Sequence, residues 1–142
     1  MDLHKEGRLD MAKKEMMSEA AWELCNTANI AEDERHYYYH QNDDGDWEFV
    51  WESSVTQPFT LSELNTKADE LWAAEAMAKV RRMRNKLLSQ SDWTQGADVP
   101  TAIKSAWTTY RQALRDMPDD NPNATLSADG TLTNVTWPTK PE

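Results

Sequence analysis

Apolar residues recur at helical spacing near the start of the chain. Between Asp2 and about Asn26 they occupy one predicted face, at Leu9, Ala12, Met16, Ala20 and Leu24. Residues three and four apart are neighbours on a helix, so this spacing predicts an amphipathic N-terminal helix. Two roles stay open for it: packing on its own domain, or docking on another chain, such as a second copy in a homo-oligomer. Methionine is over-used at binding surfaces, so Met16 is a candidate contact for the second role.

A second, longer stretch of helical spacing follows Thr60. Glu63 stands three residues after Thr60, which is the signature of a capping box at the start of a helix. No proline or glycine then interrupts the chain before Gly96. Two overlapping apolar stripes run along this stretch, one of Leu64, Ala68, Leu71, Ala78 and Leu88 and the other of Trp72, Ala76, Val80, Met83 and Leu87. They predict a long helix that is buried on more than one side.

A third helical stretch begins after a polar loop, Ser91–Gly96. Asp98 precedes Val99 and Pro100, and proline is well tolerated in a first helical turn. We therefore expect Asp98 to cap a helix that begins near Val99. Its predicted apolar face holds Ile103, Ala106, Trp107, Tyr110, Leu114 and Met117. With the preceding helix it makes a long-short αα-hairpin.

Several residues of this hairpin have definite expected places. Trp107 lies on the apolar face and is expected in the core. Arg111 and Arg115 lie off that face, and Pro118 is expected to stop the helix because it disfavours the helical conformation of the residue before it. Trp93, in the polar loop, either packs beneath the helix pair or offers a hot-spot side chain to a partner.

The segment from Arg35 to Ser53 changes character. His36–His40 and Trp47–Trp51 are rich in strand-favouring residues, and the turn-forming segment Asn42–Asp46 separates them. The pattern predicts a β-hairpin, which is marginally stable alone and must lie on a helix or extend another sheet. In the second case its edge pairs with a strand of a partner. The candidate contact residues of the hairpin are Tyr38, Trp47 and Trp51.

Two groups in this hairpin invite a metal-site hypothesis, and their spacing argues against both. On a strand, His36 and His40 would lie about 13 Å apart, with no nearby cysteine or third ligand. The acidic turn that starts at Asn42 lacks the glycine at the sixth position and the glutamate at the twelfth that an EF-hand calcium loop needs. The sequence therefore predicts no metal and no other cofactor.

The C-terminal tail is polar but patterned. Thr125–Ser127 and Thr131–Val135 flank the turn signal Asp129-Gly130, which predicts a small hairpin. Trp137 either pins the tail onto the αα-hairpin, or the tail is loose and orders on a partner. The complete pattern predicts a mainly α, α+β fold. We expect an N-terminal helix and β-hairpin segment over residues 1–59 and a helical domain with its tail over residues 60–142.

Composition narrows the function classes. The net charge of −10 disfavours binding to nucleic acid or to an anionic membrane, and it makes the basic residues between Lys79 and Lys86 a solvated face. The single Cys25 cannot form an internal disulfide and fits a reducing cytosol. The polar N-terminus predicts no signal peptide, and no run is apolar enough to span a bilayer. We find no catalytic arrangement of side chains and expect no enzymatic activity.

The second half of the chain resembles a known family. The strings Ser91–Gln95 (SDWTQ) and Tyr110–Asp116 (YRQALRD) occur in order, with a closing Trp137-Pro138. They resemble the phage tail assembly chaperone family, a small domain at the C-terminal end of tail-fibre or tail assembly proteins of tailed bacteriophages. The structural motif carried by the resemblance comprises Arg84, Asp92, Asp98, Trp107, Tyr110, Arg111 and Trp137. Within it we expect Arg84 to reach the carboxylate of Asp92 or Asp98 and to lock the loop.

The resemblance implies a non-catalytic protein that binds tail or tail-fibre subunits in the host bacterial cytoplasm during assembly. The alternative is a minor structural protein that is retained in the virion, at the mature tail, baseplate or fibre attachment. In both cases the expected partners are phage tail or tail-fibre proteins.

Overall fold

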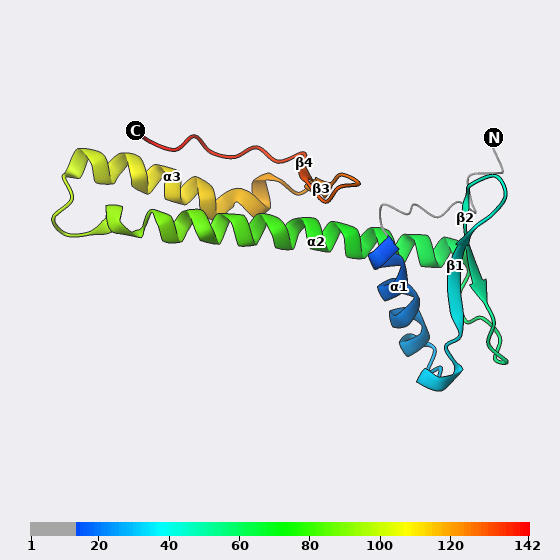
Figure 1. The fold of residues 1–142 in the computed structure, drawn as a ribbon. Helices are drawn as coiled ribbons and strands as arrows, with labels where there is room; N and C mark the ends of the chain where they lie inside the picture. Colours follow the sequence, from blue (N-terminus) through cyan, green and yellow to red (C-terminus); the bar gives the residue numbers. More distant parts are fainter. Residues whose placement is uncertain (1–13) are drawn as a thin grey trace. The chain divides into compact units, whose positions relative to one another are not determined.

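A computed structural model describes residues 14–142. Its elements are α1 (Lys14–Thr27), η2 (Glu32–Glu34), β1 (Tyr37–Gln41), β2 (Trp47–Trp51), α2 (Leu61–Gln90), η3 (Asp92–Gln95), α3 (Thr101–Asp120), β3 (Thr125–Leu126) and β4 (Leu132–Thr133), as drawn in Figure 1. The prediction of a mainly α, α+β fold is confirmed. The chain divides into two compact units, residues 1–72 and 73–142, and the first turns of α2 pack in the first unit. The predicted organisation into a segment of residues 1–59 and a domain of residues 60–142 stays a prediction.

In the first unit, α1 packs on its own domain, as one of the two predicted roles requires. Its fully buried residues are Met17, Ala20, Ala21 and Cys25. The buried face is therefore turned by about one residue from the predicted stripe, and Met16 and Leu24 are only partly buried beside it. The predicted helical residues 2–13 lie outside the described part of the chain. Burial raises the pKa of the Cys25 thiol.

The aromatic hairpin is confirmed, and it lies against this helix. β1 and β2 pair antiparallel, with Tyr37 opposite Trp51 and Tyr39 opposite Phe49. Residues that alternate along a strand share a face, so one face carries five of the six Tyr, Trp and Phe side chains of the strands, and Tyr38 lies on the other face. That face packs on the first core cluster through Tyr37, Tyr39, Trp47, Phe49 and Trp51. A hairpin that would be marginal alone is thus stabilised by burial of its aromatic face.

Two local predictions in this unit are also confirmed. In the hairpin turn, Asn42 Oδ1 accepts hydrogen bonds from the amides of Asp44 and Asp46, and Gly45 adopts a left-handed conformation with φ of +81°. At the start of α2, the Thr60 amide donates to Glu63 Oε2 over 2.7 Å and the Glu63 amide donates to Thr60 Oγ1 over 3.2 Å. This is the reciprocal geometry of a capping box.

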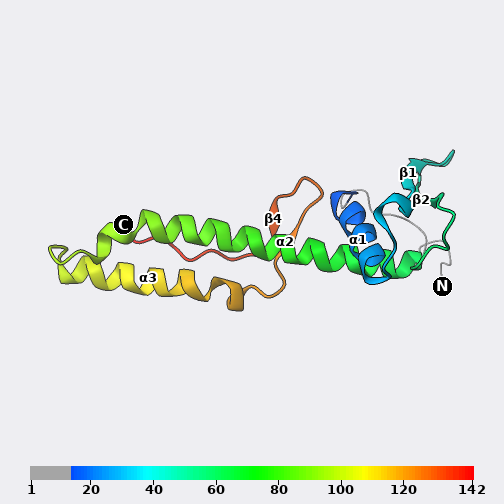
Figure 2. The same cartoon turned by 90° about the horizontal axis from the view of Figure 1, so that it is seen from below.

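The second unit is a helix pair with an extended tail. Its core joins α2 to α3 through buried residues of both helices and the segment after them, namely Val80, Trp107, Tyr110, Leu114, Met117 and Ala124. In Figures 1 and 2, α3 lies alongside the later part of α2, and the C-terminal segment follows the two helices. The predicted small hairpin is present as β3 paired with β4. Trp137 packs against the core, which confirms that it pins the tail.

The ends of α3 differ from the prediction. Pro118 does not stop the helix but lies inside its last turn, and α3 ends at Asp120. Proline in a helix removes the hydrogen bond to the carbonyl four residues earlier, and its ring crowds that carbonyl, yet α3 continues for two residues beyond Pro118. The Asn121 amide and side chain then both donate to the carbonyl of Met117, over 3.1 and 2.9 Å. At the other end, α3 begins at Thr101, and no side chain caps it, so the predicted cap by Asp98 is wrong.

Within residues 14–142, no helix combines the length and the apolar character that crossing a membrane requires.

Candidate partner-binding site

Two neighbouring tryptophans at the tip of the helix pair differ sharply in burial. Trp107 is buried, with 6% of its surface exposed, and its ring meets Tyr110 edge-on at 5.6 Å between centroids. Trp93, in η3, contacts Trp107 at 5.8 Å between ring centroids but is 62% exposed. Of the two places predicted for Trp93, it takes neither completely: it rests on the core ring and leaves most of its indole in solvent.

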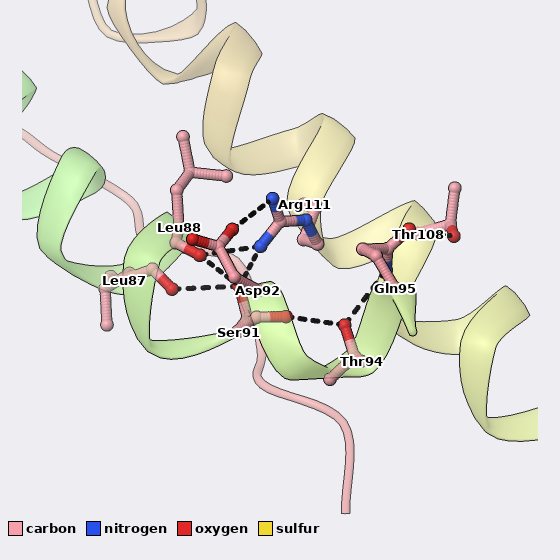
Figure 3. A network of polar contacts seen from close by, with 8 residues as sticks. All are labelled: Leu87, Leu88, Ser91, Asp92, Thr94, Gln95, Thr108 and Arg111. Atoms are coloured by element: carbon pink, nitrogen blue, oxygen red, sulfur yellow. Dashed lines mark hydrogen bonds and ion pairs between the residues drawn. The ribbon is translucent and has the colours of Figure 1, made fainter. Parts of the chain in front are cut away.

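Arg111 holds the loop that carries Trp93 (Figure 3). Its Nη1 donates to the carbonyl of Leu88 over 2.6 Å and to Ser91 Oγ over 2.7 Å. Its Nη2 forms an ion pair with Asp92 Oδ1 over 2.8 Å. The last carbonyls of a helix lack intrahelical partners and carry partial negative charge. A cation at this end of α2 therefore donates hydrogen bonds to the free carbonyls and is attracted by their charge.

The placement of Arg111 corrects two predictions. It was expected off the apolar face, yet it is only 8% exposed, because it lies one helical turn after Trp107 and faces the end of α2. The guanidinium that locks Asp92 was expected to be that of Arg84. Arg84 instead donates to Asn85 Oδ1 over 3.1 Å and to the carbonyl of Arg115 over 3.5 Å.

A second chain of hydrogen bonds ties η3 to both helices (Figure 3). Ser91 Oγ donates to the carbonyl of Leu87 over 2.9 Å, and Thr94 Oγ1 donates to the carbonyl of Ser91 over 2.6 Å. Gln95 Nε2 then donates to Thr94 Oγ1 over 2.9 Å, and Thr108 Oγ1 on α3 donates to Gln95 Oε1 over 3.4 Å. Ser91 and Thr94 are buried. These side chains belong to the SDWTQ string that carries the resemblance, and no individual roles were predicted for them.

Gly96 and Asp98 complete the turn into α3. A side-chain carbon at Gly96 would come within 2.9 Å of Asp98 Oδ1, so the aspartate needs the space that glycine leaves. The Val99 amide donates to the Gly96 carbonyl over 3.3 Å, and the Lys104 amide donates to that of Pro100 over 2.9 Å. Asp98 therefore packs against the loop backbone rather than the first turn of the helix.

A small cavity lies beside the two tryptophans. Its volume is about 100 Å³, and its lining consists of Leu87, Gln90, Ser91, Trp93, Trp107, Tyr110 and Lys140. Lys140 Nζ lies 5.6 Å from the centre of the Trp107 ring, within the range of a cation–π contact. Ile103, one turn before Trp107 on α3, was predicted in the core but is 43% exposed. The tip thus combines a cavity with aromatic walls and exposed apolar side chains.

The other candidate contact residues belong to the first unit. Tyr38 is 44% exposed on the outer face of the hairpin. Trp47, Trp51 and Met16 are partly buried against the first core cluster, and Trp51 Nε1 donates to the carbonyl of Val55 over 2.8 Å. That these four residues contact a partner stays a prediction, and it concerns the exposed part of each side chain.

The comparison with protein-family models finds one match, which lies in the second unit. Residues 77–142 match the family described as "Phage tail assembly chaperone protein". The match confirms the resemblance and supports a role in phage tail assembly. No curated protein and no solved structure matches the chain. Every residue of the Trp93 and Arg111 site lies within the matched residues 77–142, whereas α1 and the β1–β2 hairpin precede them.

Proposed function

We propose that the chain is a non-catalytic bacteriophage tail or tail-fibre assembly protein that binds tail or fibre subunits through the surface around Trp93. One observation carries this proposal: an indole that is 62% exposed stands at the tip of the family-matching region, on a loop fixed by Arg111. Tryptophan is enriched at binding hot spots, and burying its exposed apolar area in a complex is favourable.

The fixed loop favours binding for a second reason. Association loses free energy when flexible groups must be ordered, and a preorganised side chain reduces that loss. Here the polar contacts of Arg111 and of Ser91, Thr94 and Gln95 hold the loop before a partner arrives. The cavity between Trp93 and Lys140 offers room for an apolar side chain of the partner. Recognition by shape and apolar contact needs no chemical step, so we expect no turnover.

The binding surface is tested by replacing tryptophans one at a time in the full chain. Trp93→Ala is compared with Trp22→Ala, which removes a partly exposed tryptophan from α1 in the other unit. Binding to purified tail and fibre proteins of the same phage is measured by calorimetry. We expect Trp93→Ala to weaken binding by about thirtyfold, as a hot-spot residue does, and Trp22→Ala to leave it unchanged. Equal affinities for Trp93→Ala and the unaltered chain would exclude the Trp93 surface.

The role in assembly is tested by mass spectrometry of infected-cell lysate and of purified mature particles. An assembly protein that leaves before completion is abundant in the host cytoplasm and absent from particles. Presence at a fixed stoichiometry in particles would instead identify a minor structural component of the tail, baseplate or fibre attachment. Absence of any complex with tail or fibre proteins in the lysate and the particles would contradict both.

A further inference from the structure

The net negative charge of the chain comes from one of its two units. Residues 1–72 hold 6 Lys and Arg against 17 Asp and Glu, a net charge of −11. Residues 73–142 hold 9 against 8, a net charge of +1, and the two values give the −10 of the whole chain. The acidic character is therefore a property of the unit with the β1–β2 hairpin. The family-matching region, which contains the Trp93 site, is close to neutral.

The hairpin lies in the most acidic part of this unit. Between residues 15 and 66 the only Lys or Arg is Arg35. Its guanidinium is engaged, because Nε and Nη2 donate to the carbonyl of Ile30 and the group stacks 4.2 Å from the centre of the Trp22 ring. The acidic residues around the strands are Glu32, Asp33, Glu34, Asp43, Asp44, Asp46, Glu48 and Glu52. A positively charged segment is attracted to such a surface and a negative one is repelled.

The strands also offer backbone groups for pairing. In the described part of the chain, β1 and β2 form a sheet of two strands, so each has one edge without a neighbouring strand. The Glu52 amide donates to the His36 carbonyl, and the Asn42 amide donates to that of Asp46, both over 2.8 Å. Antiparallel pairs alternate, so the backbone groups of Tyr39 on β1 and Phe49 on β2 point away from the partner strand.

The usual protection of edge strands is weak here. Natural edge strands are commonly guarded by lysine or proline, and neither occurs between His36 and Gln57. The outer face instead carries the exposed Tyr38 opposite Val50 and His40 opposite Glu48. Meanwhile the inner face is held by its five aromatic side chains, so the hairpin is a fixed template for a further strand.

We propose that an edge of the β1–β2 hairpin accepts an extended, basic segment of a partner protein as an additional strand. Backbone hydrogen bonds supply the pairing, and lysine or arginine at alternating positions of the segment meets the acidic surround. This inference rests on the proposed function and adds to it the chemical class of the partner's binding segment. The peptide experiments below need no phage particle, so the added-strand proposal can fail while the assembly role stands. The assembly role can likewise fail while the peptide still binds.

The first experiment measures binding of three synthetic peptides to the full chain by calorimetry. One alternates lysine and threonine, the second replaces every lysine by glutamate, and the third has the sequence of the first with a methyl group on every backbone nitrogen. We expect the lysine–threonine peptide to bind, its binding to weaken as salt is added, and the glutamate peptide not to bind. A methylated backbone nitrogen donates no hydrogen bond to a strand, so the methylated lysine peptide should bind at least tenfold more weakly. Equal binding of the two lysine peptides would mean charge attraction alone and would overturn the proposal.

The second experiment locates the new strand by amide hydrogen exchange. Binding of the lysine–threonine peptide should slow exchange at Tyr39 and Gln41 if it pairs with β1, or at Phe49 and Trp51 if it pairs with β2. Unchanged exchange at both edges would overturn the proposal. So would slow exchange at both edges in the free chain, because the edges would then already be covered.

The third experiment uses matched charge reversals. Asp43→Lys with Asp44→Lys changes the hairpin and leaves the turn-forming Asn42 and Gly45 in place. Asp119→Lys with Asp120→Lys makes the same change of charge at exposed positions of the other unit. We expect the first double variant to bind the lysine–threonine peptide about tenfold more weakly and the second to bind it normally. Equal weakening by both would attribute binding to net charge and overturn the proposal.

Discussion

In the first unit the strands supply five aromatic side chains and the helix α1 buries mostly small ones, with Met17 as the exception, whereas in the second unit both packing partners are helices and the large buried side chains come from α3. Ala20, Ala21 and Cys25 of α1 leave room for the aromatic face of the hairpin. Trp107, Tyr110 and Leu114 of α3 instead fill the space beside α2 themselves. Small residues permit close approach, and large ones fill a wider gap at similar packing density.

The units differ also in how they use polar groups. The buried residues of the first core cluster are all apolar, and the reciprocal hydrogen bonds of Thr60 and Glu63 lie at an exposed helix start. The second unit buries Arg111 between its helices, where the arginine closes the end of α2. A buried charge destabilises a fold unless it is paired and hydrogen-bonded. The stability of the second unit therefore depends on the hydrogen-bond partners of Arg111, and that of the first unit depends on how well its side chains fill the core. Four predictions test this difference, from the largest expected effect to the smallest.

The largest effect is expected where bulk is removed from the helix pair. Trp107→Ala should lower the free energy of unfolding by about 3–5 kcal/mol, since it leaves a cavity under Tyr110. Urea denaturation followed by circular dichroism measures the loss. Trp93→Ala is the control, with an expected loss of about 1 kcal/mol or less from one aromatic contact. Equal losses in the two variants would show that both tryptophans belong to the core.

Removing the buried cation comes next. Arg111→Leu should lower the free energy of unfolding by about 2–3 kcal/mol, because the Leu88 carbonyl and the Ser91 hydroxyl lose their donor. Asp92→Asn is the matched variant. The Asp92 side chain is 66% exposed, so this change should lower the free energy of unfolding by only about 0.5 kcal/mol. Losses of the same size in chemical denaturation would mean that the ion pair, and not the bonds to the end of α2, holds the loop.

In the first unit, adding bulk should be the damaging change. Ala20 is fully buried in the first core cluster, so Ala20→Leu forces side chains apart and should lower the free energy of unfolding by about 1–3 kcal/mol. Ala74→Leu, at an exposed position of α2, should change it by about 0.5 kcal/mol or less. Thermal unfolding of both variants checks this. A neutral Ala20→Leu would contradict the close packing of α1.

The smallest effect concerns the β3–β4 turn and appears only in acid. Hydrogen bonds from the Ser127 hydroxyl and the Thr131 amide lower the pKa of Asp129 from 3.8 to about 2. A depressed pKa means that the stabilisation is complete above the ordinary value and is lost as pH falls from about 4 to about 2. The amide chemical shift of Thr131, followed by NMR in the folded chain, should titrate with a midpoint near pH 2. Asp129→Asn should abolish the change, and a titration centred near 4 would contradict the prediction.

Much of the fold followed from local patterns. The capping box of Thr60 and Glu63, the turn at Gly45 and the β3–β4 turn at Gly130 each involve residues close in sequence, and all were predicted correctly. The face of α1 was misjudged by about one residue, because Ala21 and Cys25 count as weakly apolar in a pattern but fit beneath aromatic rings. The spacing of apolar residues on a helix locates the buried face to within about one residue. The element that packs against the helix then decides which of the adjacent residues are buried.

The site was predicted less completely than the fold. Trp93, Asp92 and Arg111 were singled out through the strings that resemble a family, and the family match covers them. The arginine that binds Asp92 was assigned incorrectly, since Arg84 and Arg111 both lie within plausible reach in the sequence. Ser91 and Thr94 were not assigned roles, because small hydroxyl residues in a loop are also common turn formers.

The sequence by itself determined which elements form, where most of them start and stop, and which residues could make a polar lock. These properties depend on backbone preferences and on residues one or two turns apart. Only the tertiary structure decided that Arg111 closes the end of α2, that Trp93 stays exposed, and that the aromatic face of the hairpin covers α1. Each of these depends on which surfaces of separate elements pack together. The strand period of 2 residues and the helix period of 3.6 residues show which side of an element is apolar, but not which other element packs on it.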